Sequence, residues 1–170
     1  QIKDSFDKKN LLNPHKIVRP FKSDDRSLMR YKSDYKAENI STHYDWSSWG
    51  QFSDAVEMCN NNGACRKLDS GVMCPSYRVT KEEKDLVRGR ANTLRLALSN
   101  QLPKDSFVSK GMYETMELCV SCKACQRECP MSVDMAKMKS EFLSHYYRKF
   151  SMSIKDRVIS NMPKLIWLLK

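Results

Sequence analysis

The chain has 170 residues, enough for one compact domain with extensions. Apolar residues make up 41% of it, and the net charge of +10 indicates a solvated basic surface, with a docking face for an acidic protein partner or an anionic membrane surface as the alternative. No basic motif with interleaved aromatic residues is present, so we expect no nucleic-acid partner. No apolar run is long enough to cross a bilayer.

The cysteine content indicates the redox compartment. Seven cysteines is an odd number, and the first 20 residues lack the continuous apolar stretch of a secretory signal. This combination favours metal ligation or redox chemistry over a disulfide framework. We therefore expect a cytoplasmic chain, with peripheral contact at the inner face of a membrane as an alternative.

The first 50 residues are rich in Pro, Asn and Ser and predict an irregular backbone. Their last part carries an aromatic cluster, Tyr44, Trp46 and Trp49. We expect these aromatic side chains to pack against a metal-bearing core.

A first helical half follows. A short helix from Ser53 leads to Cys59 and a cysteine loop, and a longer helix is predicted from a capping box at Thr80 and Glu83 to about Asn100. Its apolar face, at spacings of four, three and four, consists of Val87, Ala91, Leu94 and Leu98.

The second half repeats this order. A short helix over 110–118 leads to another cysteine loop, and a helix capped by Ser132 runs to about Phe150. Its predicted buried face consists of Met135, Met138, Phe142 and Tyr146. A last amphipathic stretch starts at Ile154 and is expected to end near Pro163. The repeated order predicts a pseudo-symmetric pair of sites.

The cysteine loop of the second half carries the strongest signal, the spacing C-x2-C-x2-C-x3-C-P formed by Cys119, Cys122, Cys125, Cys129 and Pro130. This spacing is used for cubane iron–sulfur clusters, because three thiolates on one tight loop can reach three irons. In two-cluster proteins the fourth thiolate ligates the other cluster. Structural zinc sites usually take two C-x2-C pairs with a longer spacer, so zinc is the weaker alternative.

The cysteine loop of the first half is a degraded copy. It keeps Cys59, Cys65 and Cys74, but Asn62 stands where the second loop has Cys122. An insertion of five residues precedes Cys74. An alternative for this copy is that its cysteines are only packed in a core.

Exchange of the last cysteine between the loops predicts two unequal metal sites. Site A, with four thiolates for a [4Fe-4S] cluster, consists of Cys119, Cys122, Cys125 and Cys74. Site B, with three thiolates, consists of Cys59, Cys65 and Cys129. Site B is predicted to hold a [3Fe-4S] cluster, or a [4Fe-4S] cluster whose last iron is bound by Asn62, water or another side chain.

Several strings point to a family: CPSY at 74–77, RGRA at 88–91, CVSCKACQRECP at 119–130 and VDMA at 133–136. Over about residues 50–150 they resemble the iron–sulfur module of bacterial FAD-linked oxidases. Those are similar to D-2-hydroxyglutarate and D-lactate dehydrogenases, and their module is related to the iron–sulfur subunits of glycolate oxidase and anaerobic glycerol-3-phosphate dehydrogenase. Phe6-Asp7 and the string LNPHKI at 12–17 resemble the end of the FAD-linked oxidase domain, with His15 in place of a glycine.

The resemblance implies a mostly α fold, a helical two-cluster ferredoxin module of the succinate dehydrogenase iron–sulfur subunit type with an irregular N-terminal extension. It implies that FAD lies on an upstream domain of the same polypeptide, which oxidises a 2-hydroxy acid. The two clusters would then relay electrons to a quinone or an electron carrier, and no catalytic residue would lie in this chain. A structural module that binds zinc or one cluster and mediates protein interaction is the alternative.

The same resemblance predicts a division of the chain into four parts. Residues 1–20 are expected to end a FAD-linked oxidase domain, and residues 21–50 to form a linker. Residues 51–150 are expected to form the helical iron–sulfur domain. Residues 151–170 are expected to begin a following segment, with residues 165–170 as an element cut short.

Overall fold

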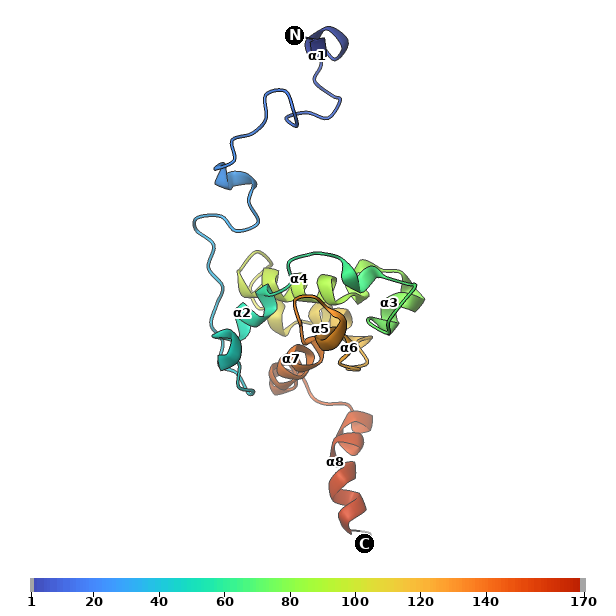
Figure 1. The fold of residues 1–170 in the computed structure, drawn as a ribbon. Coiled ribbons are helices and arrows are strands. Elements are labelled where there is room, and N and C mark those ends of the chain that lie inside the picture. Colours follow the sequence, from blue (N-terminus) through green and yellow to red (C-terminus); the bar gives the residue numbers. More distant parts are fainter. Residues whose placement is uncertain (1, 169–170) are drawn as a thin grey trace. The chain divides into compact units, whose positions relative to one another are not determined.

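A computed structural model describes residues 2–168 of the chain (Figure 1). All regular elements in that part are helices, and no strand occurs there. The prediction of a mostly α fold with an irregular N-terminal extension is therefore confirmed. Two compact units divide the chain, one within residues 1–36 and the other within residues 37–170.

The first unit contains little regular structure, only the helix α1 (Ile2–Phe6) and the 3-10 turn η1 (Arg26–Leu28). Asp7 organises the end of α1. Its carboxylate accepts hydrogen bonds from Lys3 Nζ and from the main-chain N–H groups of Leu11 and Leu12, at 2.8 and 2.9 Å for the latter two. The bond from Lys3 and these main-chain bonds lower the pKa of Asp7 to about 2.

The second unit contains the two predicted halves in order. The elements of its first half are η2 (Ser47–Trp49), α2 (Phe52–Glu57), η3 (Ala64–Arg66), α3 (Pro75–Thr80), η4 (Glu83–Asp85) and α4 (Val87–Leu98). The elements of its second half are η5 (Ser106–Val108), α5 (Lys110–Glu117), α6 (Ala124–Glu128) and α7 (Met135–Lys149), followed by α8 (Ile154–Leu168).

Helix α4 is the centre of the core and packs against α2, α5 and α7. The apolar faces predicted for α4 and α7 are both buried, which confirms the two helical periodicities. Leu94 on α4 and Phe142 on α7 have no exposed surface. This shared core fixes the starts of α4 and α7, the two helix ends that reach the cysteine loops.

Two predicted helix starts are wrong. Thr80 is the last residue of α3, and Lys81, with φ +60°, ends that helix, so α4 begins only at Val87. The reason is that Pro75, at the first position of α3, opens a separate helix that the capping-box pattern hides. At α7, Asp134 and not Ser132 is the cap, and its carboxylate accepts from Lys137 N at 3.0 Å.

The aromatic cluster packs on α2 and α7. Trp46 is buried at 3% exposure, and its ring centroid lies 4.9 Å from that of Phe52 in α2. Its indole Nε1 donates to Glu141 of α7 at 3.0 Å, and Glu141 also accepts from the main-chain N–H groups of His43 and Tyr44. These bonds fix the residues before α2 to α7, while the Tyr44 side chain stays exposed.

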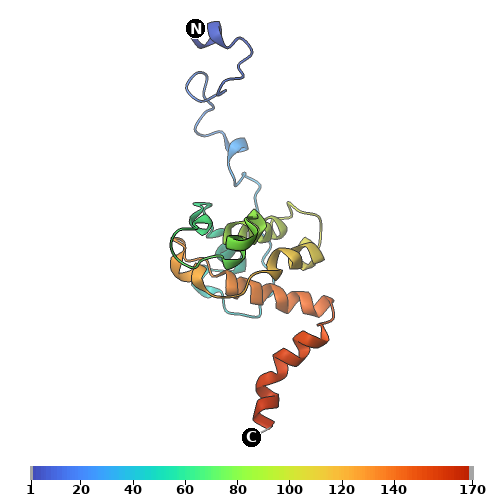
Figure 2. The same cartoon turned by 90° about the vertical axis from the view of Figure 1, so that its right-hand side faces the viewer.

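Residues 150–153 join α7 to α8 (Figure 2). Helix α8 continues past Pro163, where we expected it to end, and contains this proline in its interior, a position that costs a helix stability. Of the element expected over 165–170, the last two residues lie outside the described part. No helix in residues 2–168 is long and apolar enough to cross a membrane.

Candidate metal centre

The two cysteine loops share two left-handed backbone positions. Left-handed residues occur at Asn61 and Gly63 in the first loop, and at Ser121 and Lys123, each 60 positions later, in the second. A left-handed conformation costs roughly 1–2 kcal/mol for a residue other than glycine, so its retention at matching positions indicates a constraint on the loop path. The predicted repeat therefore extends to the main chain.

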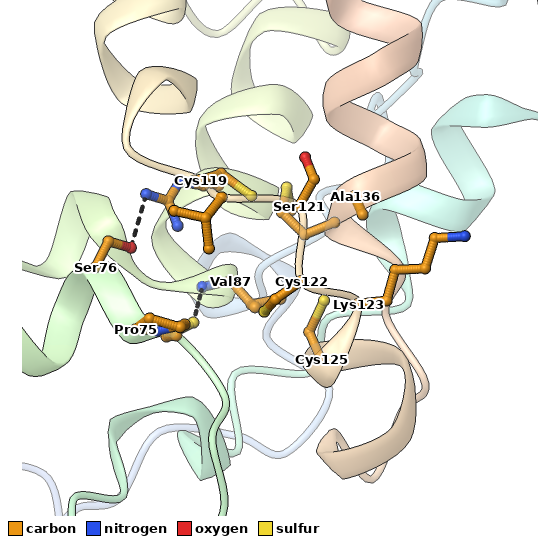
Figure 3. Close-up of a pocket in the computed structure, with 13 residues that line it drawn as sticks. Pro75, Ser76, Val87, Cys119, Ser121, Cys122, Lys123, Cys125 and Ala136 are labelled. Carbon is orange, nitrogen blue, oxygen red and sulfur yellow. Dashed lines mark hydrogen bonds between the residues drawn. The ribbon is translucent and has the colours of Figure 1, made fainter.

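All four cysteines of site A line one cavity (Figure 3). Cys119, Cys122 and Cys125 come from the second loop and the start of α6, and Cys74 comes from the first half, directly before α3. The structure thus brings together the residues that the exchange rule predicted for this site. The rest of the wall includes Pro75, Val87, Arg90, Met135 and Ala136.

Main-chain N–H groups at the starts of α4 and α7 face these sulfur atoms. Val87 N donates to Cys74 Sγ at 3.2 Å (Figure 3), and the N–H groups of Met135 and Ala136 are directed at Cys125. Such bonds, together with the positive end of each helix dipole, stabilise thiolates and the anionic cluster they would bind. The donor set therefore fits an iron–sulfur cluster.

Burial sets the protonation of these thiols. It raises the pKa of Cys74 to about 12 and raises that of Cys125, in each case against the lowering effect of the N–H donors. Both groups are thus thiols at neutral pH until a metal charge compensates for their desolvation. Binding of a cluster is expected to release protons here.

Site B is less complete. Cys59 and Cys65 are buried in the first loop, and burial raises the pKa of Cys65 although the Arg88 N–H at the start of α4 opposes this. Cys129 is half-buried at the end of α6. Its neighbours Glu128 and Pro130 line a second cavity together with residues of the first loop, Ala64 and Met73 among them. The end of α6 therefore lies against the first loop, as the exchange of cysteines requires.

Asn62, the candidate for the missing ligand, is exposed and hydrogen-bonded within its own loop. Its Oδ1 accepts from Ala64 N at 2.8 Å, and its Nδ2 donates to Asn60 Oδ1 at 2.6 Å. The amide thus shapes the turn between Cys59 and Cys65. Coordination of iron by Asn62 would require these bonds to be replaced.

The four cysteines of site A line a cavity instead of meeting at a point. No disulfide joins any of the seven cysteines, all of which are described. In the described part of the chain, no three His, Cys, Asp or Glu side chains converge as ligands of a single metal ion. A ring of thiols around a cavity suits a polynuclear cluster better than one tetrahedral zinc ion.

One known family matches part of the helical core. Residues 55–133, which include both cysteine loops, match the family described as a 4Fe-4S dicluster domain. Over these residues the helical core is similar to 4Fe-4S dicluster domains. This class implies two iron–sulfur clusters and electron transfer.

Curated relatives of the dicluster domain agree with the predicted resemblance, which is confirmed. D-2-hydroxyglutarate dehydrogenase of Pseudomonas putida is 28% identical over 194 residues, which cover 95% of this chain and 19% of that protein. The enzymes of the same name from Pantoea ananatis and Escherichia coli are each 27% identical over 197 residues, with the same coverage. The chain spans about a fifth of the length of the curated relatives it matches. No solved structure matches it.

Two cations near the cysteines of site A, the buried Arg90 and the half-buried Lys139, were not predicted. Arg90 is 1% exposed and donates to Thr115 O and Asp85 O, at 2.9 and 2.6 Å. Lys139, on α7, donates to Cys119 O at 2.6 Å, and burial lowers its pKa. Packing places Arg90 in the wall of the cavity and Lys139 on the main chain of Cys119, although Arg90 belongs to a string that carried the family resemblance.

Proposed function

We propose that this dicluster domain relays electrons from a flavin domain of the same polypeptide to an acceptor, a quinone or an electron carrier. The flavin domain would oxidise a 2-hydroxy acid, the chemical class to which the 2-hydroxyglutarate in the names of the curated relatives belongs. The observation that carries the proposal is that cysteines from both halves of the domain line the same cavity.

The proposed ligands are those of sites A and B. Site A takes Cys74 from the first half, and site B takes Cys129 from the second, so each half holds a ligand of the other's cluster. When bound, the clusters would supply one-electron carriers. The chain contributes thiolates, main-chain donors and a buried wall, and Cys74 and Cys125 are each only 6% exposed. Exclusion of water there favours retention of the cluster.

Iron and sulfide analysis of the anaerobically reconstituted chain tests the proposal. We expect about seven or eight irons per chain, with acid-labile sulfide in similar amount. Zinc without sulfide would support a structural module instead, and about four irons would support a single-cluster module.

The flavin link requires the full-length polypeptide. Under anaerobic conditions, addition of a D-2-hydroxy acid is expected to reduce the clusters, which electron paramagnetic resonance (EPR) spectroscopy detects. A full-length protein in which dithionite reduces the clusters, but no 2-hydroxy acid does, would contradict this assignment of the electron donor.

A further inference from the structure

The loop that the five-residue insertion lengthens, residues 67–73, is held by a cation on one side. Arg78 in α3 donates to three main-chain oxygens of this loop: Leu68 O at 3.1 Å, Ser70 O at 3.1 Å and Gly71 O at 2.7 Å. A planar guanidinium can hold several carbonyl groups at once, because its donors point in fixed directions. The inserted loop is therefore ordered although most of its residues are exposed.

A carboxylate holds the other end of the same loop. Glu128, the last residue of α6, accepts from Val72 N at 3.0 and 3.1 Å and from Met73 N at 3.0 Å. Gly71 lies so close that a Cβ there would stand 2.3 Å from Glu128 Oε2, and its φ is +77°. Only glycine fits this approach without displacing the carboxylate.

These hydrogen bonds connect the two exchanged ligands. Glu128 directly precedes Cys129, and Met73 directly precedes Cys74. The second loop has only three residues between its last two cysteines, against eight in the first loop, so the insertion supplies main-chain donors that the second loop lacks.

We propose that Glu128 is a positioning residue that binds the inserted loop and thereby holds Cys129 at site B. The inference rests on the proposed exchange of cysteines between the loops. It gives the insertion a role, namely to present two main-chain N–H groups to the residue beside the exchanged ligand.

Site B depends on this contact more than site A does. Cys74 is also fixed by the bond from Val87 N, by the following Pro75 and by deep burial. Cys129 is only half-buried, and site B has two other thiolates against three at site A. Loss of the Glu128 contact is therefore expected to release the cluster of site B first.

The experiment uses the anaerobically reconstituted chain and compares Glu128→Ala, Glu128→Gln and Gly71→Ala with Glu114→Ala, a control at an exposed glutamate of α5. A chelator removes iron over time, EPR assigns the loss to a site, and hydrogen exchange follows the Val72 and Met73 amides. We expect Glu128→Ala to lose iron from site B about tenfold faster and to lose amide protection, with unchanged helical circular dichroism. Gly71→Ala should also lose iron from site B faster and lose amide protection. Glu128→Gln, which keeps one acceptor oxygen, should show rates between those of Glu128→Ala and the parent chain.

The results separate this inference from the proposed function. Two clusters in the parent chain with equal chelation rates in Glu128→Ala and Glu114→Ala would overturn the role of Glu128 and leave the two clusters standing. Equal acceleration at both sites, or loss of helical signal in both Glu128→Ala and Gly71→Ala, would also overturn it. A parent chain with only one cluster would contradict the proposed function. It would also overturn the role of Glu128, because there would be no cluster at site B.

Discussion

The two cysteine loops share a backbone and differ in their ligands. The left-handed positions match at Asn61 and Ser121 and again two residues later, yet Asn62 replaces a cysteine. The first loop therefore keeps the turn geometry of a cluster-binding loop although one of its thiols is gone. This match argues against cysteines that are merely packed, since packing alone would not require left-handed residues at the same two positions of both loops.

The last cysteine of each loop, Cys74 or Cys129, shows a second difference. Cys74 is left-handed, with φ +55°, and deeply buried, whereas Cys129 has φ −76° and is half-buried. If each is a ligand of the other half's cluster, site A has four thiolates and a deeply buried last cysteine, although Cys122 is exposed. Site B has three thiolates and a half-buried last cysteine. The predictions below test this asymmetry.

The largest expected effect comes from Cys74→Ser. If Cys74 belongs to site A, this variant should lose about four irons and give the same remaining EPR spectrum as Cys122→Ser. Cys129→Ser is the matched comparison and should resemble Cys65→Ser. A Cys74→Ser spectrum that matches Cys65→Ser would show that the ligands are not exchanged.

Arg90→Met tests whether a buried ion pair in the wall of site A stabilises the fold. Arg90 and Asp85 are 2% and 1% exposed in their side chains, and their nearest charged atoms are 3.4 Å apart. Removal of the cation leaves a buried carboxylate unpaired, so the free energy of unfolding should fall by about 3–5 kcal/mol. Urea denaturation measures this, and Arg90→Met with Asp85→Asn should recover part of the loss. A loss of unfolding free energy no larger than that of Arg66→Met, at an exposed arginine, would contradict the stabilising role of this ion pair.

Glu141→Gln tests the buried carboxylate of α7 that binds the residues before α2. Burial raises the pKa of Glu141, but hydrogen bonds from Trp46, His43 and Tyr44 outweigh it, so the pKa lies below the ordinary 4.5. Because the folded pKa is depressed, this stabilisation is complete above the unfolded pKa and is lost as the pH falls through the folded one.

The substitution is expected to cost about 1.5–3 kcal/mol at neutral pH, measured by urea denaturation. The difference from the parent chain should shrink below pH 4.5. His145, whose Nε2 lies 3.1 Å from Glu141 Oε1, is the titratable neighbour, so His145→Gln is the control. A difference that stays constant from neutral to acidic pH would contradict the role of the carboxylate.

Asn62→Cys is expected to have the smallest effect, the gain of one iron ligand. It restores the spacing of the second loop, so any three-iron EPR signal in the oxidised chain should disappear and the iron content should approach about eight. Asn62→Ser, which keeps a short polar side chain without a thiol, is the control. An unchanged three-iron signal in Asn62→Cys would show that position 62 does not face the open corner of site B.

Local pattern predicted the buried faces of α4 and α7 and the short helices before each loop, because apolar spacing reports directly on burial. It did not predict that α3 and α4 are separate, since Thr80 and Glu83 fit a capping box that the structure does not form. At the cysteines, spacing was enough to propose which thiols belong together. The buried Arg90 and the contact between Glu128 and the inserted loop could not be predicted, because both depend on packing between halves distant in sequence.

Mössbauer spectroscopy of the anaerobically reconstituted chain, with iron counted on the same sample, tests the central claim most directly. Two unequal sites predict about seven or eight irons in two spectrally distinct sets, one fully thiolate-ligated and one with an iron missing or differently ligated. A single set of about four irons, unchanged by Cys59→Ser, would contradict the account.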